Sequence, residues 1–544
     1  MTPDLSPLRR TAVAAGLLLA LATPTLAQLP VPPEPFENET TPEKAILGKI
    51  LFWEEQLSAD NSVACGTCHL PEWGGGDFRH VRTAGPDGIL FTDDDAFGSP
   101  GVPKADVNNR LVPDPGRGFL DQITRRNSPS FIGAQYFTFL FWDGRADTRF
   151  VDPQTGLESI ENLGGLESQA VEPIVSPVKM GHEGRTWDEV TRKLGRIRPL
   201  ALAADVPADI VDALGTDPTY PDLFATAFGD PAITAERIAF AIASYERILI
   251  PDDTPWDRFN QGDLSALTPD QQEGLFLFES VAGCTSCHPA PLFADDLFRN
   301  IGLRSATTDP GRMEVTGSFL DRGRFKTPGL RNVALRPRLM HDGSITSLRE
   351  ILAFYNRGGD FTDNRDAAIF PLGLSLLDRA RIQSFLELGL LDQRVLNRQP
   401  PFDRPTLQSE LVSDGRSYGT ASPGSGGFVP EVLFSAPAAV ANPDYRLGLF
   451  RGLGGAEALL LVSTNPLEEL RDGVPFNVDP DQARLMRPFR LRGAGPGQGH
   501  ATFKARIPDD PDLVGSVFFA QWFVQDPAAT GGVAASRGER IEVF

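Results

Sequence analysis

Two copies of one short motif constrain this chain more than any other feature. Residues 65–69 are Cys-Gly-Thr-Cys-His and residues 284–288 are Cys-Thr-Ser-Cys-His, and these segments contain all four cysteines of the 544 residues. In this spacing both thiols bond to a porphyrin, and the histidine gives the iron an imidazole. A redox or zinc-binding cysteine pair that happens to precede a histidine is the alternative. Two matches without a leftover cysteine favour two covalently bound haem c groups, held by Cys65, Cys68, His69, Cys284, Cys287 and His288.

The chain is acidic, and its first residues have the pattern of an export signal. Its formal net charge of −21 argues against nucleic acid and anionic membrane surfaces as partners. Arg9 and Arg10 precede an apolar run over 12–22 and a small-residue cleavage site at 25–27, so residues 1–27 are predicted to be a signal peptide. The apolar run is too short to span a membrane, and no later stretch qualifies. We therefore expect a periplasmic or otherwise exported protein without a membrane span.

A repeated pattern precedes the two motifs. Thr41-Pro42 starts a helical pattern before the first motif, and Thr268-Pro269 starts another before the second. Threonine at the N-cap and proline at the first helical position satisfy or remove unpaired backbone donors at a helix start. The repetition of helix, loop and attachment turn predicts two tandem cytochrome c-like haem domains, over residues 28–258 and 259–410.

The composition changes after residue 410. Residues 411–430 are rich in glycine, serine and proline, which is typical of a linker. Beyond them, short runs rich in Val, Leu and Phe, as at 458–462 and 516–524, are separated by glycines and prolines. This pattern predicts a small β-rich, sandwich-like domain over 431–544, whose role the sequence does not indicate. The expected fold class is therefore mainly α, with two tandem haem domains followed by a β-rich domain.

Ordered motifs around the attachment sites extend over residues 41–400. They include Arg126-Asn127-Ser128-Pro129, Phe141-Trp142-Asp143-Gly144-Arg145, Asp309-Pro310-Gly311-Arg312 and Met340-His341-Asp342-Gly343. In these motifs the chain resembles the bacterial di-haem cytochrome c peroxidases, a family that includes the enzyme that matures methylamine dehydrogenase. The resemblance implies an oxidoreductase that reduces hydrogen peroxide to water with electrons from a small cytochrome c or cupredoxin. It implies that the first haem meets peroxide and the second passes electrons to it, and it leaves a homodimer open.

The resemblance also assigns roles to three side chains near the haems. Trp142 matches the tryptophan that relays electrons between the porphyrins, and a plain core aromatic is the alternative. Gln169 matches a distal-pocket position and is expected to hydrogen-bond peroxide. Lys179, in Pro177-Val178-Lys179-Met180, stands where the family has its acid–base glutamate.

The lysine is the sharpest departure from the family pattern. Cleavage of peroxide needs a group that moves a proton between its two oxygens, and protonated lysine cannot accept one. A desolvated Lys179 can lose its charge and act as a base, with His182, Glu183 or Gln169 as other candidates, and a solvent-facing lysine in a shifted loop is the remaining alternative. We therefore expect weakened peroxidase activity and a gain when Lys179 is replaced by glutamate.

The distal ligand of the second haem also departs from the usual pattern. Counting from His341, its position falls on Tyr355, where the peroxidases usually have methionine and the maturation enzyme has tyrosine. A phenolate ligand favours ferric and higher oxidation states. Met340 and Met313 are the fallback ligands, and a tyrosine of the core is the alternative.

Two further positions bear on metal binding. Asn127 matches a position of a calcium or structural-ion site between the domains, which backbone carbonyls near Arg336 and Arg338 would complete. An asparagine with a capping role is the alternative. The position whose histidine often blocks the first haem falls on Gly85, so we expect an open iron there, and ligation by His80 is the less favoured alternative.

Two other functions remain open at this point. Tyr355 favours a high-valent di-haem oxidase of a protein or organic substrate, as the maturation enzyme is. Lys179 favours a non-catalytic di-haem electron-transfer protein. Peroxide-dependent oxidation of reduced cytochrome c separates the peroxidase from the electron carrier.

Overall fold

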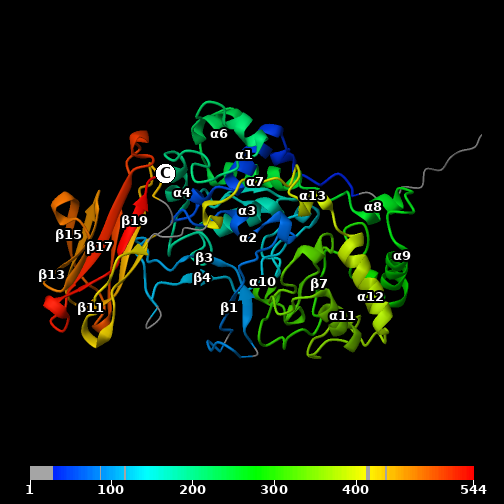
Figure 1. The fold of residues 1–544 in the computed structure, drawn as a ribbon. Coiled ribbons are helices and arrows are strands. Elements are labelled where there is room, and N and C mark those ends of the chain that lie inside the picture. The colour runs from blue at the N-terminus through cyan, green and yellow to red at the C-terminus, as the bar shows by residue number, and fades with distance from the viewer. Residues whose placement is uncertain (1–28, 86, 93, 115–117, 412–416, 435–437) are drawn as a thin grey trace, which may run out of the picture.

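The computed structural model describes residues 29–85, 87–92, 94–114, 118–411, 417–434 and 438–544. The expected signal peptide, residues 1–27, lies outside the described residues, as do positions 412–416 of the expected linker. Figure 1 shows a helical body that makes up most of the molecule and a β-rich region at one end of it. Within these described ranges, no helix is long and apolar enough to cross a membrane.

The helices of the body are mostly short and are joined by long irregular segments. Their bounds are α1 (Pro42–Phe52), α2 (Cys65–Cys68), α3 (Gly165–Val175), α4 (Trp187–Leu194), α5 (Ala208–Leu214), α6 (Tyr220–Phe228), α7 (Ala235–Arg247), α8 (Pro255–Asn260), α9 (Pro269–Phe276), α10 (Met313–Thr316), α11 (Leu348–Arg357), α12 (Leu376–Ser384) and α13 (Gln393–Leu396). The predicted N-caps are formed: Thr41 Oγ1 accepts the backbone N–H of Lys44 at 3.2 Å, and Thr268 Oγ1 accepts that of Gln271 at 3.3 Å. Both helix starts therefore follow from the sequence as expected.

One kind of helix crossing occurs twice in the body, once before each attachment motif. In the first, α1 packs on α7, and in the second, α9 packs on α12. A glycine lies at each crossing: a Cβ on Gly48 would lie 1.9 Å from the carbonyl oxygen of Ala241, and one on Gly274 would lie 2.1 Å from that of Arg381. Each pair of helices can come this close only because the glycine has no side chain.

Each helix pair has its own buried core. Phe52 and Tyr245 belong to the core around α1 and α7, and Phe278 and Phe385 belong to the core around α9 and α12. We call the parts built on these cores the first and the second helical unit. Residues 395–407, expected in the second domain, contribute three buried side chains to the core of the first unit instead. The chain thus returns to the first helical unit before it enters the β-rich region.

Short two-stranded sheets interrupt the irregular segments of the body. They pair β1 (Val81–Thr83) with β2 (Ala96–Gly98), β3 (Pro100–Pro103) with β4 (Asp121–Ile123), β5 (Phe150–Val151) with β6 (Glu158–Ile160), and β7 (Phe298–Arg299) with β8 (Phe325–Lys326). Of these, β3 reaches the site described below, because the backbone N–H of Val102 donates to the carbonyl oxygen of Lys179 at 2.9 Å.

The β-rich region contains two antiparallel sheets and a separate hairpin. The smaller sheet has the order β10-β11-β16 and the larger has the order β15-β12-β17-β19-β9, with β18 paired to β17. Leu449 of the smaller sheet shares one buried cluster with Leu460 and Trp522 of the larger sheet. The bounds are β9 (Ser417–Tyr418), β10 (Glu431–Phe434), β11 (Tyr445–Gly454), β12 (Glu457–Ser463), β13 (Pro466–Arg471), β14 (Val474–Val478), β15 (Ala483–Arg490), β16 (Gly495–Ala505), β17 (Val517–Gln525), β18 (Val533–Ala535) and β19 (Gly538–Glu542).

The described part of the expected linker, residues 417–430, belongs to this region. Strand β9 pairs with β19, with Gly538 opposite Tyr418. Ser425 Oγ donates to Asp526 Oδ1 at 2.5 Å, which ties the following turn to the end of β17. Glycine and serine here make turns and an edge strand, so composition alone placed the boundary too late.

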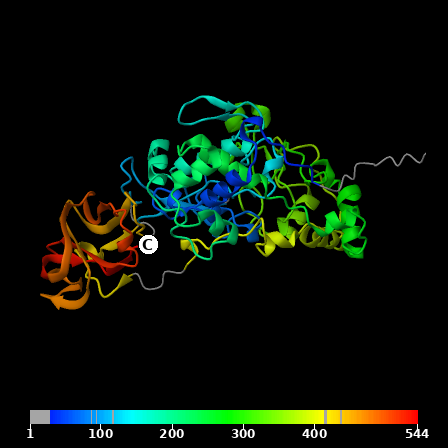
Figure 2. The same cartoon turned by 90° about the horizontal axis from the view of Figure 1, so that it is seen from above.

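The β-rich region is docked on the first helical unit (Figure 2) through buried polar contacts. Arg446 of β11 is 1% exposed, forms an ion pair with Asp60 at 3.3 Å and donates to Asn109 Oδ1 at 2.8 Å. The backbone N–H of Leu111 donates to Thr502 Oγ1 at 3.1 Å. The segment between β3 and β4 therefore carries much of this junction.

Candidate active site

Both attachment motifs line one cavity. Its volume is about 690 Å³, and its walls come from both helical units. The structure brings together all eleven residues that the sequence placed at the site: Cys65, Cys68, His69, Asn127, Trp142, Gln169, Lys179, Cys284, Cys287, His288 and Tyr355.

The two motif histidines are held as haem ligands need to be. His69 Nδ1 lies 3.1 Å from the carbonyl oxygen of Gly75, and His288 Nδ1 lies 2.7 Å from that of Phe293. A carbonyl only accepts, so each Nδ1 carries the proton and each Nε2 keeps the lone pair that iron binds. Burial lowers the pKa of His69 to about 4 and also lowers the pKa of His288, and both shifts favour the neutral ring. The sequence did not locate these two carbonyls, because backbone atoms leave no residue-type signal.

The four cysteine side chains are partly buried in the cavity wall, and none of them forms a disulfide. At the first motif, a Cβ on Gly66 would lie 2.1 Å from the ring of Trp53, so only glycine fits between the two cysteines. Thr67 Oγ1 accepts the N–H of Ala64 at 2.8 Å and fixes the start of α2. Together with the neutral imidazoles, this arrangement fits covalent haem at both motifs.

Tyr355 lies on α11 and lines the cavity beside the second motif. Burial raises the pKa of its hydroxyl. The fallback ligand Met340 also lines the cavity, whereas Met313 does not. Tyr355 as an iron ligand stays a prediction, and its place in the wall is the one that role requires.

Trp142 and Asn127 connect the two helical units. Trp142 is 9% exposed, and its Nε1 donates to the backbone oxygen of Asn127 at 2.7 Å. The Nδ2 of Asn127 lies 3.1 Å from the carbonyl oxygen of Arg338 and 3.2 Å from that of Met340. The side-chain amide thus meets one of the carbonyls expected for a calcium site. His80 Nε2 lies 2.9 Å from Asn127 Oδ1, and His80 is absent from the cavity wall.

Polar groups gather in the wall where the family pattern places peroxide. Gln169 and Glu172 come from α3, and Lys179 comes from the turn that follows it. Lys179 Nζ donates to Glu172 Oε2. Burial lowers the pKa of Lys179, and the charge of Glu172 opposes that shift. Glu172 was missed in the sequence, although its i, i+3 spacing from Gln169 puts both on one helix face.

The other acid–base candidates, His182 and Glu183, lie elsewhere. His182 lines a separate pocket between the first helical unit and the β-rich region, next to Lys193 and Asp444. Its Nδ1 lies 2.9 Å from the backbone oxygen of Glu183. The expectation that either residue could act in the distal pocket is therefore wrong, because the turn after Met180 leads away from the cavity.

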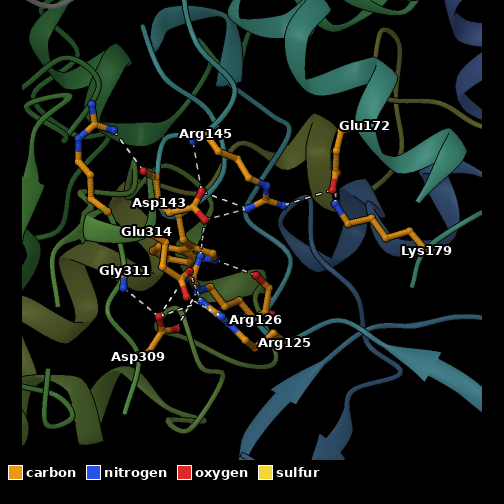
Figure 3. Close-up of polar contacts among 12 residues, drawn as sticks. Arg125, Arg126, Asp143, Arg145, Glu172, Lys179, Asp309, Gly311 and Glu314 are labelled. Atoms are coloured by element: carbon orange, nitrogen blue, oxygen red, sulfur yellow. Dashed lines mark hydrogen bonds and ion pairs between the residues drawn. The ribbon is translucent and has the colours of Figure 1, made fainter. Parts of the chain in front are cut away.

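A chain of alternating charges runs from Lys179 to the second helical unit (Figure 3). Beyond Glu172, Arg145 lies 3.8 Å from that carboxylate and 3.1 Å from Asp143. Arg126 then joins Asp143 to Asp309, each at 2.6 Å. Since Asp309 belongs to the second unit, the network links the two sides of the cavity around Trp142. The motifs containing these residues were visible in the sequence, but their pairing was not.

Known proteins are similar to this chain in sequence and in fold. The family described as di-haem cytochrome c peroxidase matches residues 42–265. Cytochrome-c peroxidase IdrP1 of Pseudomonas sp. (strain SCT) is 28% identical over 445 residues, which cover 74% of this chain and 96% of that protein. Methylamine utilization protein MauG of Methylorubrum extorquens is 31% identical over 358 residues, which cover 65% of this chain and 80% of that protein.

A solved structure agrees with this assignment at the level of the fold. The crystal structure of a MauG-like protein associated with microbial copper homeostasis aligns with a TM-score of 0.50 and 23% identity, over 69% of this chain and 96% of that one. With the two attachment motifs on a single cavity, these matches show that the chain belongs to the di-haem cytochrome c peroxidase family, and that it is an oxidoreductase with two covalently bound haem c groups.

Proposed function

We propose that this protein reduces hydrogen peroxide to water with electrons from a small cytochrome c or cupredoxin. The observation that carries the proposal is the asymmetry of the cavity. Gln169, Glu172 and Lys179 supply hydrogen-bonding and charged groups at one part of its wall, and Tyr355 lies beside the second motif. The reduction of peroxide takes two electrons, and each donor molecule supplies one. A polar site for peroxide at one haem and a second haem that stores an electron are suited to this reaction.

The side chains divide the work as follows. One haem would be held by Cys65, Cys68 and His69 and the other by the equivalent residues at 284–288, and Tyr355 would be available as a ligand to the second iron, since all of these residues line the cavity. The bound iron porphyrins supply the electron transfer that cleaves the O–O bond. Gln169 donates a hydrogen bond that orients peroxide, and Trp142 fills the space between the units, where it shortens the electron path. Asn127 and the carbonyl of Arg338 contribute to a calcium site at the junction.

We also propose that the protein acts outside the cytoplasm after removal of residues 1–27. The small-residue site at 25–27 supports cleavage before Gln28. Mass spectrometry of protein purified from a haem-competent bacterial host tests this: the mature chain is expected to begin at Gln28 and to carry two haem masses. An uncleaved chain in the cytoplasm would contradict the proposed location.

The activity is tested by mixing the holoprotein with reduced cytochrome c and hydrogen peroxide. We expect two molecules of cytochrome c to be oxidised for each peroxide, and no oxidation without peroxide. A pyridine haemochrome assay run in parallel counts the haems. Cytochrome oxidation that does not depend on peroxide, in a protein with two haems, would favour the electron carrier and overturn the peroxidase.

A second candidate function, oxidation of a protein or organic substrate, is favoured by Tyr355 in the wall of the second site. A phenolate ligand stabilises oxidised iron, so such a protein keeps oxidising equivalents instead of drawing electrons quickly from a donor. In the same assay, rapid loss of peroxide with little oxidation of cytochrome c would favour this function.

A further inference from the structure

The cavity wall holds a carboxylate beside the lysine that replaces the family's glutamate. We propose that Glu172 is the acid–base residue for hydrogen peroxide in this protein, and that Lys179 and Arg145 hold its carboxylate in place. The inference rests on the proposed function and assigns the proton transfer to a position that the family pattern does not use.

Glu172 is placed by the helix that also carries Gln169. The two residues are three positions apart on α3, so their side chains leave the same face of the helix. Both line the cavity together with Lys179. The carboxylate and the amide can therefore contact one small ligand at the same time.

Two cations fix the carboxylate from opposite sides. Lys179 Nζ donates to Glu172 Oε2, and Arg145 Nη2 lies 3.8 Å from Oε1 (Figure 3). The ring of Phe141 supports both cations, since the centroid is 4.5 Å from Lys179 Nζ and 3.6 Å from Arg145 Cζ. The side chain of Glu172 is 39% exposed, so neither cation covers it. It is oriented but still accessible, as a proton-transfer group needs to be.

The other ionisable groups in the wall are less suited to accept a proton. The ammonium group of Lys179 can donate hydrogen bonds but cannot accept one, and it already donates one to Glu172. The carboxylate of Asp143 forms ion pairs with Arg126 and Arg145, and the carboxylate of Glu314 forms an ion pair with Arg125. Glu246 is 3% exposed, on α7. Among the described residues of the wall, Glu172 is the carboxylate that adjoins the family's acid–base position.

The proposed step conserves atoms and charge. Glu172 accepts the proton of one peroxide oxygen and gives it to the other oxygen, so the carboxylate is regenerated. The O–O bond breaks, its electron pair leaves with the protonated oxygen, and this oxygen departs as water. The remaining oxygen becomes the second water after it takes up two electrons from the donor and two protons from solvent.

The first test compares Glu172→Gln with Lys179→Gln by stopped-flow measurement of the reaction with peroxide. Loss of a general acid–base group lowers the rate constant by roughly 10²- to 10⁴-fold, and we expect this loss in E172Q and a smaller one in K179Q. Glu158→Gln is the matched control, because Glu158 pairs with Arg149 at 3.7 Å with similar exposure and does not line the cavity. A wild-type rate in E172Q, or the larger loss in K179Q, would overturn the proposal.

The second test moves the carboxylate. In the double variant Glu172→Gln with Lys179→Glu, a carboxylate stands at the family position and an amide at 172. We expect this variant to recover most of the rate that E172Q loses. If the double variant stayed as slow as E172Q, a carboxylate at this end of the cavity would not be sufficient for the proton transfer, and the proposal would fail.

A binding measurement separates this proposal from the proposed function. Hydrogen cyanide loses a proton when it binds ferric haem, so its association, followed by visible absorption, needs a proton acceptor but no turnover. We expect slow association in E172Q and wild-type association in E158Q, with equal melting temperatures showing that the variants are folded. If the wild type fails to oxidise cytochrome c while cyanide binding still depends on Glu172, the peroxidase proposal fails and this one stands. Equal cyanide association in E172Q and wild type contradicts this one alone.

Discussion

The two helical units share a scaffold and differ in what faces the cavity. In each, a glycine lets two helices touch, a Cys-x-x-Cys-His turn follows, and a backbone carbonyl fixes the histidine. Near the first motif the wall contains Gln169, Glu172 and Lys179, and beside the second it contains Tyr355. The two units thus share the scaffold around the attachment motif and differ in the side chains that line the cavity beside it.

The largest expected effect comes from removing one attachment site at a time. With Cys65→Ala and Cys68→Ala together, we expect one haem per chain and no fast reaction with peroxide, because the polar wall then has no iron beside it. With Cys284→Ala and Cys287→Ala together, we expect one haem per chain and a reaction with peroxide that persists, but loss of cytochrome c oxidation. A haemochrome assay measures the haem content of each variant, and stopped-flow absorbance measures its reaction with peroxide. If the reaction with peroxide were lost in the 284/287 variant and kept in the 65/68 variant, the roles of the two units would be exchanged.

A smaller effect is expected on stability when the shared glycines are filled. In Gly48→Ala and Gly274→Ala, the new methyl group meets a backbone oxygen, and overpacking of this kind costs about 1–3 kcal/mol of unfolding free energy. Denaturant unfolding measures the loss. Gly195→Ala is the control, because its Cβ would lie 3.5 Å from the nearest atom. If one of the two glycines tolerates alanine as well as Gly195 does, the units are not built alike.

Replacement of Trp142 probes the connection between the units. We expect Trp142→Phe to slow donor-dependent turnover about tenfold, a change of about 1.4 kcal/mol in the barrier, while the direct reaction with peroxide stays fast. Trp187→Phe is the control, since Trp187 is 7% exposed in the same unit and does not line the cavity. Equal effects of the two variants would make Trp142 an ordinary core residue.

The smallest change is expected to be spectroscopic. If Tyr355 binds iron, the ferric protein lacks a methionine–iron charge-transfer band, and Tyr355→Phe raises the reduction potential of the second centre alone. Spectroelectrochemistry measures both quantities. A methionine band in the wild type would identify Met340 as the ligand and remove one difference between the units.

The sequence predicted the site well wherever chemistry depends on residue type. The attachment turns, the N-caps at Thr41 and Thr268, and the apolar runs of β12 and β17 have local signals. Lys179 was identified from its motif, and it lines the cavity. These features need only the residue and its near neighbours in the chain.

What the sequence missed depends on contacts between distant segments. The carbonyls of Gly75 and Phe293 act through backbone atoms, and the pairing of Arg126 with Asp309 spans the two units. The segment around β9 looked like a linker because a two-residue edge strand leaves no periodic pattern. Glu172 was recoverable from helix geometry, but only once α3 and the turn at Lys179 were known to meet.

The docked β-rich region has a consequence for any attempt to shorten this protein. A chain ending before residue 417 would leave the buried carboxylate of Asp60 without Arg446, and it would expose Leu111 and the ring of Phe119, which lies 5.7 Å from Phe450. Leu111 and Phe119 lie in the segment that joins β3 to β4, and Val102 of β3 holds the backbone of Lys179. The β-rich region therefore supports the cavity wall through β3, and a chain without it is expected to hold the backbone of Lys179 less firmly.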